Sequence, residues 1–545
     1  MTDKDLIYLV NAGNDPGMAS MSNDYSFPAL GVLALGTWLK QKMPNEIDLM
    51  VRDGAVRSLE DVIEEITTNR PLLVGVSTLC TSYQNSLKIA EAAKSYGGTV
   101  VFGNDQASQN SKSILKHQEN VDYIIGAEYG EVPLELLVRH IRGEEIPLNQ
   151  IPTLTYRSKS GEIKGFDYDD PVNRSFMLIT NPFSGYRILR EEGHVNKKDV
   201  IDLFPVVDRT LFPKDHWDTY LNNYLGKFAS FHLDNSLIEQ LKERHPNWCD
   251  ETHSDHRMYK EKTIERAREV VSGVSTMNRI RGCSRRGESI CRHCDIVGVR
   301  NGEISMSSPE MFWEEVRAAY NQVGANSLYE CCDSFSSFPE LIKEIVKAKP
   351  NDLGFDPRFY IYAQARDLAE HPDRVRLLKE MGVFRVNMGL ESMCDSTLKN
   401  MKGEKDSVKK NYQALKLLRE AGINVYGSFV LGSEKETPET LAKTVRHVRK
   451  LIKNGYLCDV EAQPVLPLSG NYQGSVLRDH GLMTVDQDNP DWPTNVGELS
   501  KVYIDRFSGV SHQDCVDAAK EIRNTARQYE INSGSGVSME GSYQN

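Results

Sequence analysis

The chain has 545 residues, 39% of them hydrophobic and 26% charged, which predicts a globular protein of two to four domains at roughly 100 to 200 residues each. Its formal net charge of -12 argues against a protein that coats nucleic acid, because phosphate binding needs a basic face. No apolar run reaches the roughly 18 residues of a membrane span and the N-terminus lacks a secretory pattern, so we expect a cytoplasmic protein without membrane contact.

Residues 1–145 alternate short apolar runs with amphipathic helical stretches. Such alternation predicts an α/β domain with a doubly wound, Rossmann-like parallel sheet. Ligands of these sheets bind beyond the carboxyl ends of the strands, so the loops at those ends are the candidate site. These loops are NAGNDPG (11–17), residues 77–82, GNDQAS (103–108) and GAEYGE (126–131).

Five pieces of this region occur in an order that resembles the cobalamin-binding domain of B12-dependent radical SAM enzymes: LGVLALGTWLK, IDLMVRDG, LLVGVST, VVFGNDQAS and VDYIIGAEYGEVPLELL. The chain departs from that family at residues 103–106, where a Gly-Gly pair and a His are common, and it has no Asp-x-His-x-x-Gly motif. The resemblance therefore implies cobalamin bound base-off, without a protein His on cobalt. The implied contacts are Ser77, Thr78, Thr81, Gly103, Asn104, Glu128 and Gly130. The alternative is an ordinary flavodoxin-like domain with solvated loops.

Residues 146–275 are less regular and carry no recognisable chemistry. PTLTYRSKSGEI (152–163) predicts a hairpin. VVDRTLFPKDHWDTY (206–220) resembles the linker between the cobalamin domain and the barrel of the same enzymes, which supports the order of the domains.

Three cysteines, Cys283, Cys291 and Cys294, lie close together in RGCSRRGESICRHCDI (281–296). Three thiolates on one loop suit a [4Fe–4S] cluster with one iron left open. Two alternatives stay open on spacing alone, a Cys3His zinc site that includes His293 and a redox-active CRHC dithiol. Spacing favours the cluster, because the adjacent side chains of His293 and Cys294 seldom converge on one ion.

Residues 276–475 again alternate strands and helices, which predicts βα units suited to an open barrel. Cysteines after the first strand, followed by VFRVNMGLES, LLREAGINVYGSFVLGSEKET and AQPVLPLSGN, resemble the radical SAM superfamily. The resemblance implies a partial (β/α)6 barrel with a [4Fe–4S] cluster, at which S-adenosylmethionine is cleaved to a 5'-deoxyadenosyl radical. One departure is that seven residues, not three, separate Cys283 from Cys291.

Position at the carboxyl ends of the expected barrel strands selects five candidates for binding S-adenosylmethionine. They are Glu330, Asp333, Arg366, Gly389 and Glu391. Each also has a structural alternative: Asp333 can cap a helix, Arg366 can pair with a neighbouring acid, and Glu391 can start the next helix.

Resemblance to both halves implies a methyltransferase in which methylcobalamin donates a methyl group to a substrate radical, supplied with electrons by a flavodoxin or ferredoxin. The widened cysteine spacing and the chain length resemble the phosphinate P-methyltransferases of phosphinothricin-type biosynthesis. Arg285 and Arg286 would then grip a small anionic substrate beside the cluster, because guanidinium groups suit oxyanions. The alternatives are a solvated arginine loop, a methyltransferase for sp3 carbon, and a non-catalytic zinc-containing cobalamin sensor.

The end of the chain is expected to add little chemistry. Residues 476–531 predict a helical cap on the barrel, and residues 532–545 are rich in Gly and Ser, which predicts disorder.

Overall fold

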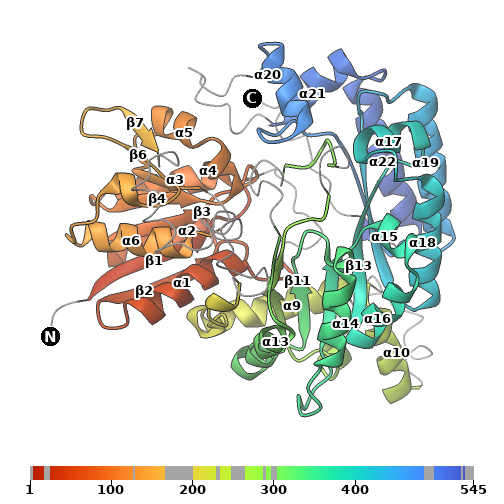
Figure 1. Ribbon diagram of the computed structural model, residues 1–545, viewed down its shortest axis with the longest axis horizontal. Helices are drawn as coiled ribbons and strands as arrows, with labels where there is room; N and C mark the ends of the chain where they lie inside the picture. The colour runs from red at the N-terminus through yellow and green to blue at the C-terminus, as the bar shows by residue number, and fades with distance from the viewer. Residues whose placement is uncertain are drawn as a thin grey trace.

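The structure is a computed structural model of the chain and forms two α/β bodies that lie side by side (Figure 1). No helix among the residues it describes has the length and apolar character needed to cross a membrane. The described residues are 4–16, 25–126, 129–165, 201–228, 233–246, 264–285, 290–295, 304–483, 496–529 and 532–533.

The first body is a seven-stranded sheet in the order β2-β1-β3-β4-β5-β6-β7. Its first five strands are parallel, so their carboxyl ends share one edge, and the order reverses between β1 and β3. Side chains alternate along β1, where Leu9 packs with α1 and α6 on one face and Tyr8 packs with α2 and α3 on the other. The elements are β1 (Asp5–Asn11), α1 (Leu30–Lys42), β2 (Ile47–Asp53), α2 (Leu59–Asn69), β3 (Leu73–Ser77), α3 (Tyr83–Lys94), β4 (Thr99–Gly103), α4 (Asp105–Gln109), α5 (Ser111–His117), β5 (Tyr123–Ile125) and α6 (Glu131–Ile141).

The predicted hairpin joins this sheet. Strands β6 (Leu154–Arg157) and β7 (Ile163–Gly165) pair antiparallel with each other, and β6 pairs antiparallel with β5. The sheet therefore continues to residue 165, past the boundary predicted at 145, because the βα alternation on which that boundary rested stops before the sheet does.

The described part of the linker seals the amino-terminal end of the barrel. Helix α9 (Lys214–Phe228) places Tyr224 and Phe228 in a buried cluster with Tyr360 and Phe384, which lie near the starts of two barrel strands. Helix α10 (Asn235–Arg244) adds Leu237 and Leu241 to this cluster. The linker thus has a packing role that its sequence did not reveal. Its short helices are η2 (Ile201–Leu203) and η3 (Arg209–Leu211), after η1 (Leu148–Gln150).

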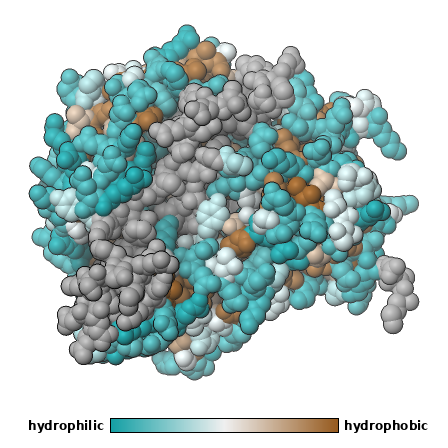
Figure 2. Space-filling view, turned by 180° about the vertical axis from the view of Figure 1, so that it is seen from behind, coloured by the Kyte–Doolittle hydropathy of each residue, from teal (hydrophilic) through white to brown (hydrophobic). Residues whose placement is uncertain are grey.

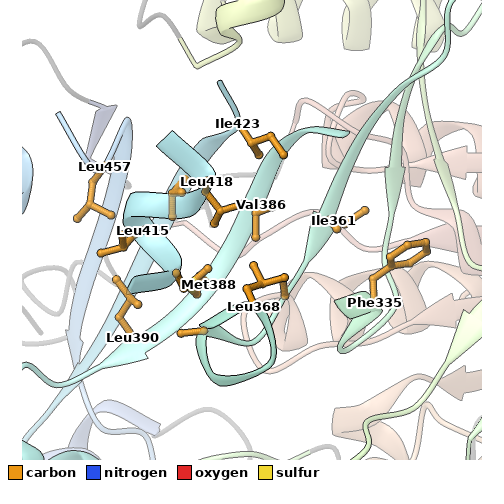
Figure 3. Close-up of a cluster of buried hydrophobic side chains, with 14 of the residues drawn as sticks. Phe335, Ile361, Leu368, Val386, Met388, Leu390, Leu415, Leu418, Ile423 and Leu457 are labelled. Carbon is orange, nitrogen blue, oxygen red and sulfur yellow. The ribbon is translucent and has the colours of Figure 1, made fainter. Parts of the chain in front are cut away.

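The second body is a sheet in the order β16-β15-β14-β13-β12-β11-β8, in which six longer parallel strands alternate with helices, as expected for a partial (β/α)6 barrel. Apolar side chains from its strands and helices form one large core, part of which is drawn in Figure 3. The elements are β8 (Val274–Met277), α13 (Pro309–Val323), β11 (Ser327–Glu330), η5 (Phe335–Ser337), α14 (Pro339–Lys347), β12 (Arg358–Tyr362), α15 (Ala365–Glu370), α16 (Asp373–Met381), β13 (Val383–Glu391), α17 (Asp395–Lys402), α18 (Val408–Glu420), β14 (Asn424–Leu431), α19 (Pro438–Lys453) and β15 (Asp459–Pro464).

The cysteines lie in the long connection between β8 and α13. Strands β9 (Ile280–Arg281) and β10 (Ser305–Met306) pair antiparallel and close the base of this connection. We call residues 282–304 the cysteine loop. It leaves the carboxyl end of the first barrel strand, which is the end where barrel enzymes place their chemistry.

Helices α20 (Tyr472–Asp479), α21 (Val496–Phe507) and α22 (His512–Gln528) follow the barrel, and α20 spans the boundary predicted at 475. The prediction of disorder from residue 532 is wrong for its first two residues, which form β16 (Asn532–Ser533) because the edge of β15 offers unpaired backbone groups. The rest of that tail lies outside the described residues. On the face in Figure 2, the described residues are mostly hydrophilic, with apolar residues in small separate patches.

Candidate functional site

A cavity of about 490 Å³ lies where the carboxyl edge of the first sheet faces the mouth of the barrel. Its wall from the first body includes the loops after β1, β3 and β4, which flank the point where the strand order reverses. Its wall from the second body includes Arg281 from β9 and Tyr329 from β11, together with Thr276, Asn278 and Cys331. Ligands of doubly wound sheets bind at such a position.

Two glycines let the loops after β1 and β2 meet beside this cavity. A Cβ on Gly13 would lie 2.3 Å from the carbonyl oxygen of Gly54, and a Cβ on Gly54 would lie 2.5 Å from the backbone nitrogen of Gly13. Both neighbours are backbone atoms, so neither can rotate away. The two loops therefore keep their close approach only with glycine at both positions.

Alanine at Gly13 is expected to lower the free energy of unfolding by about 1–3 kcal/mol, the usual cost of overpacking, because backbone atoms must move apart. Gly31 is a matched control: it also lines the cavity, and a Cβ there meets no atom within 4 Å. Urea unfolding of Gly13→Ala and Gly31→Ala checks this. Equal stability of the two variants would contradict the close approach of the loops.

The amino terminus of α3 is occupied by the chain itself. The Asp15 carboxylate accepts hydrogen bonds from the backbone N–H groups of Gln84 at 3.0 Å and Asn85 at 2.7 Å. A nucleotide phosphate commonly binds such a helix terminus, so Asp15 takes the place of that ligand here. Asp15 thus ties the loop after β1 to the start of α3.

Four of the seven predicted cobalamin contacts line the cavity: Ser77, Gly103, Asn104 and Gly130. Asn104 donates to the Ser77 hydroxyl at 3.0 Å, which joins the loops after β3 and β4. The structure does not place Thr78 or Thr81 on the cavity wall; Thr78 is buried, and its backbone N–H donates to the carbonyl oxygen of Gly103. Glu128 lies outside the described residues. The small and polar edge fits a large ligand that approaches the backbone closely.

The three cysteines have the donor chemistry of an iron–sulfur site. Cys283, Cys291 and Cys294 form no disulfide, and the Cys294 N–H donates to the Cys291 carbonyl oxygen in a turn. Burial raises the pKa of the Cys291 thiol, and the positive charges of Lys402 and Arg285 oppose that rise. No three Cys, His, Asp or Glu side chains within the described ranges already surround a single point. The donor set thus fits a cluster in kind, and its side chains must converge to bind one.

His293 does not join the thiols. Its Nε2 lies 3.4 Å from the Glu391 Oε1, so the ring faces the barrel strand β13. This arrangement disfavours the Cys3His zinc alternative.

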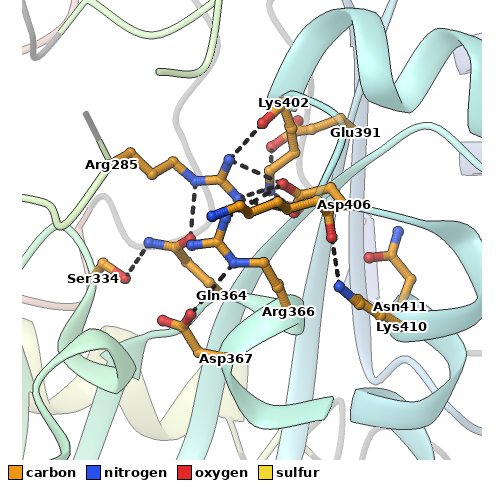
Figure 4. Close-up of polar contacts among 12 residues, drawn as sticks. Arg285, Ser334, Gln364, Arg366, Asp367, Glu391, Lys402, Asp406, Lys410 and Asn411 are labelled. Atoms are coloured by element: carbon orange, nitrogen blue, oxygen red, sulfur yellow. Dashed lines mark hydrogen bonds and ion pairs between the residues drawn. The ribbon is translucent and has the colours of Figure 1, made fainter. Parts of the chain in front are cut away.

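The contacts of Arg285 argue against the prediction that this residue binds a substrate anion. Only 5% of the residue is exposed; its guanidinium pairs with both carboxylate oxygens of Asp406 and donates to Gln364 at 2.9 Å and to the Lys402 carbonyl oxygen at 2.7 Å (Figure 4). These bonds attach the cysteine loop to the barrel. Arg285 is therefore a structural residue and not a ligand for a substrate anion, because its donors are already used. Arg286 lies outside the described residues.

The five predicted contacts of S-adenosylmethionine surround the cysteine loop, although none of them lines the described part of the cavity. At the start of the loop, Glu330 accepts from the Arg279 N–H at 3.4 Å and Asp333 from the Gly282 N–H at 3.1 Å. On its other side, Lys402 contacts Gly389 and Glu391, and Asp406 lies near Arg366; Glu391, Arg366, Lys402 and Asp406 are labelled in Figure 4. The Lys402 Nζ donates to the Gly389 carbonyl oxygen at 2.5 Å and lies 3.5 Å from the Glu391 Oε1. The Arg366 Nη1 lies 4.0 Å from the Asp406 Oδ2, and its Nε lies 3.7 Å from the Asp367 Oδ1.

Glu391 and Glu330 differ sharply in their electrostatics. Burial alone would raise the pKa of Glu391, but His293 and Lys402 hold it at about 2. Burial raises the pKa of Glu330 to about 8, because backbone N–H groups and Arg279 only partly offset the loss of water. Glu391 is thus an anion at neutral pH, whereas burial favours the protonated form of Glu330.

Glu330→Gln is expected to remove a pH dependence of stability. The folded protein keeps a proton on Glu330 that the unfolded chain loses above its ordinary pKa of 4.5. The stability linked to this proton is therefore fully present below that value and is lost as the pH rises through about 8. Unfolding of wild type and Glu330→Gln across this interval checks the difference, with Glu340→Gln, on the surface of α14, as the control. Parallel curves would contradict it.

Asp53, which the sequence analysis missed, lines the cavity. Asp53 is buried at the end of β2, where it accepts hydrogen bonds from Asn11, from the backbone N–H groups of Ala29 and Ala55, and from the hydroxyl of Tyr220 on α9. The available signal was its place directly after a buried strand. The tyrosine on the linker, 167 residues away, gave no signal.

Comparison with known proteins assigns the second body. Residues 277–448, which include all three cysteines, match the family described as the radical SAM superfamily. This stretch is a radical SAM domain. The resemblance predicted from the cysteines and the βα alternation is thereby confirmed, and the domain's cysteine loop and six-stranded barrel have the expected order.

Two curated relatives match shorter stretches. The anaerobic magnesium-protoporphyrin IX monomethyl ester cyclase of Rubrivivax gelatinosus is 29% identical over 112 residues, or 21% of this chain and 19% of the relative. The bacteriochlorophyllide d C-8(2)-methyltransferase of Chlorobaculum tepidum is 30% identical over 124 residues, or 23% of this chain and 26% of the relative. The chain thus spans about a fifth and about a quarter of the lengths of these relatives.

Two solved structures share the architecture of both bodies. The radical S-adenosylmethionine methyltransferase TsrM from Kitasatospora setae, solved with cobalamin and a [4Fe–4S] cluster, has a TM-score of 0.59 at 16% identity and covers 88% of this chain and 79% of its own. The cobalamin-dependent S-adenosylmethionine radical enzyme OxsB, solved with aqua-cobalamin and S-adenosylmethionine, has a TM-score of 0.53 at 16% identity. The match covers 97% of this chain and 62% of the OxsB chain. The predicted fold, a Rossmann-like sheet before a radical SAM barrel with a helical end, is confirmed.

Proposed function

We propose that this protein is a cobalamin-dependent radical SAM methyltransferase. The observation that carries the proposal is the cavity between the carboxyl edge of the first sheet and the barrel mouth, and the cysteine loop begins directly after Arg281 on the wall of this cavity. Its support is the radical SAM domain, the fold shared with TsrM and OxsB, and the methyltransferase among the relatives.

Each cofactor has a candidate place in the chain. Cys283, Cys291 and Cys294 would hold the [4Fe–4S] cluster, with Glu330, Asp333, Arg366, Gly389 and Glu391 near S-adenosylmethionine. Ser77, Gly103, Asn104 and Gly130 would contact base-off cobalamin. When bound, these groups supply a carbon radical and a methyl donor, respectively. The chain itself keeps the two sites apart, encloses the space between them and fixes the cysteine loop through Arg285.

The substrate we propose is a small anion in this cavity, with an H-phosphinate as the candidate from the cysteine spacing. Since Arg285 is engaged, Arg281 is the cationic side chain on the described cavity wall, and it lies over the ring of Tyr129 at 4.8 Å. The carbon alternative has its own support, because the relative from Chlorobaculum tepidum is named as a C-8(2)-methyltransferase. A flavodoxin or ferredoxin would supply the electrons in either case.

Anaerobic purification followed by turnover tests the proposal. We expect a brown protein that binds iron, sulfide and cobalamin, and that transfers label from S-adenosylmethionine to one member of a panel of H-phosphinates and carbon substrates. Transfer to carbon alone would reject the phosphinate. A colourless protein with stoichiometric zinc would reject the enzyme and favour the sensor.

A further inference from the structure

We propose that Asp295 is a positioning residue that joins the cysteine loop to the first sheet and so sets the distance between the cluster and cobalamin. The inference rests on the proposed function for its consequence, and on the contacts of Asp295 itself for its geometry. Asp295 directly follows Cys294, so the position of its carboxylate constrains the last thiol of the loop.

The Asp295 carboxylate bridges two segments that are distant in sequence. One oxygen accepts from the side-chain amide of Gln109, the last residue of α4, and the other accepts from the backbone N–H of Gly470 at 2.7 Å. Helix α4 begins at Asp105, directly after its N-cap residue Asn104, which lines the cavity and accepts a hydrogen bond from the Asp105 N–H with its side chain. One short helix therefore connects the cavity wall with the residue after Cys294.

Neighbouring contacts reinforce the same junction. The Ser469 hydroxyl donates to the Asn110 side chain at 2.9 Å, which links the loop after β15 to the helix pair α4 and α5. Asn471 donates to the carbonyl oxygen of His293 at 3.2 Å, within the cysteine loop. The first sheet, the cysteine loop and the loop after β15 thus meet at one place.

The space at this junction is matched to the carboxylate. A Cβ on Gly470 would lie 2.5 Å from the Asp295 Oδ1 and 3.0 Å from the Gln109 Oε1. Only glycine lets the backbone N–H of residue 470 approach the carboxylate so closely. The junction is consequently a fitted contact, in contrast to an exposed ion pair between long side chains.

The rate of a reaction that involves two bound cofactors depends on the distance between them, so a contact that fixes this distance matters. A misplacement of about 1 Å can cost about 100-fold in rate, and the two proposed cofactors are held by different bodies of the protein. Asp295 and Gln109 form a direct side-chain bridge between those bodies at the cysteine loop. Losing this bridge would leave both sites formed while changing their separation.

The test compares Asp295→Ala with Asp295→Asn and Gln109→Ala in the full chain. The asparagine amide can still accept from Gly470 and can donate to Gln109 after its side-chain amide turns over, so Asp295→Asn should keep the junction. Asp295→Ala and Gln109→Ala should weaken it from either side. Gln109→Ala does not alter the amino-acid sequence of the cysteine loop, so the test stays valid if Asp295→Ala folds poorly.

Hydrogen exchange of the cofactor-free protein is the first readout, because it does not depend on the proposed function. Residues 105–110 and 290–295 should exchange faster together in both alanine variants and remain as in the wild type in Asp295→Asn. Faster exchange in 290–295 alone would overturn the junction. This result would stand even if the wild type bound no cobalamin, an outcome that contradicts the proposed function and not the bridge.

The loaded enzyme gives the second readout. Asp295→Ala and Gln109→Ala should bind iron and cobalamin at wild-type stoichiometry, lose about 100-fold in kcat with KM unchanged, and alter the magnetic interaction between the reduced cluster and cob(II)alamin. An unchanged interaction would overturn the positioning role. Loss of iron would also overturn it, because Asp295 would then belong to the cluster site itself.

Discussion

Alanine in place of Cys291 is expected to abolish iron–sulfur binding and methyl transfer while cobalamin uptake stays intact. Under the proposed function Cys291 supplies one of three thiolates, and two thiolates do not hold a [4Fe–4S] cluster with one open iron. The proposed cobalamin contacts belong to the first sheet, which has its own apolar core on both faces. The measurement is iron, sulfide and cobalamin content after anaerobic reconstitution.

The matched control for this variant is Cys458→Ala. Cys458 lies directly before β15, outside the cysteine loop, and its thiol donates to the carbonyl oxygen of Val425 in β14. Its replacement should leave iron content and turnover at wild-type values. If Cys291→Ala lost cobalamin together with iron, the two sites would be one folding unit and the division of the chain into two cofactor-binding bodies would be wrong.

Alanine in place of Asp459 is expected to have the largest effect on stability, a loss of about 3–5 kcal/mol, the usual cost of leaving a buried charge without its partner. Asp459 and Arg385 are both fully buried and form an ion pair at the amino-terminal end of the barrel. The Arg385 guanidinium also lies 4.8 Å from the ring centre of Phe228 on the linker helix α9. Urea or thermal unfolding measures the loss.

A double variant distinguishes two causes of the lost stability: the unpaired charge left on Arg385, and the packing lost with the Asp459 side chain. Arg385→Met combined with Asp459→Leu removes both charges and should recover most of the stability, because apolar replacements of a buried pair are often neutral. Asp352→Ala removes an exposed partner of Arg317 and should unfold as the wild type does. A double variant as unstable as Asp459→Ala would show that packing, and not the unpaired charge, dominates at this position.

Local patterns predicted much of the fold. The short apolar runs predicted before residue 145 became β1 to β5, because a strand buried by helices on both faces needs a continuous apolar run. The hairpin after residue 150 was also expected, but its pairing with β5 was not, since antiparallel addition to a sheet edge leaves no periodic signal. The candidate site was harder to predict than the fold. The charge of Arg285 and its place near Cys283 suggested that it binds a substrate anion, but its partner is Asp406, 121 residues away in the sequence.

The sequence by itself determined the order of the two α/β bodies, the parallel strands and the cysteine loop between the first barrel strand and its helix, because each of these follows from periodicity and spacing along neighbouring residues. Only the tertiary structure decided which side chains meet. It paired Arg285 with Asp406, turned His293 towards Glu391, placed Arg281 on the cavity wall and joined Asp295 to Gln109 across the two bodies. These contacts depend on how separate layers pack against one another, and packing between layers is not recorded in any local stretch of the chain.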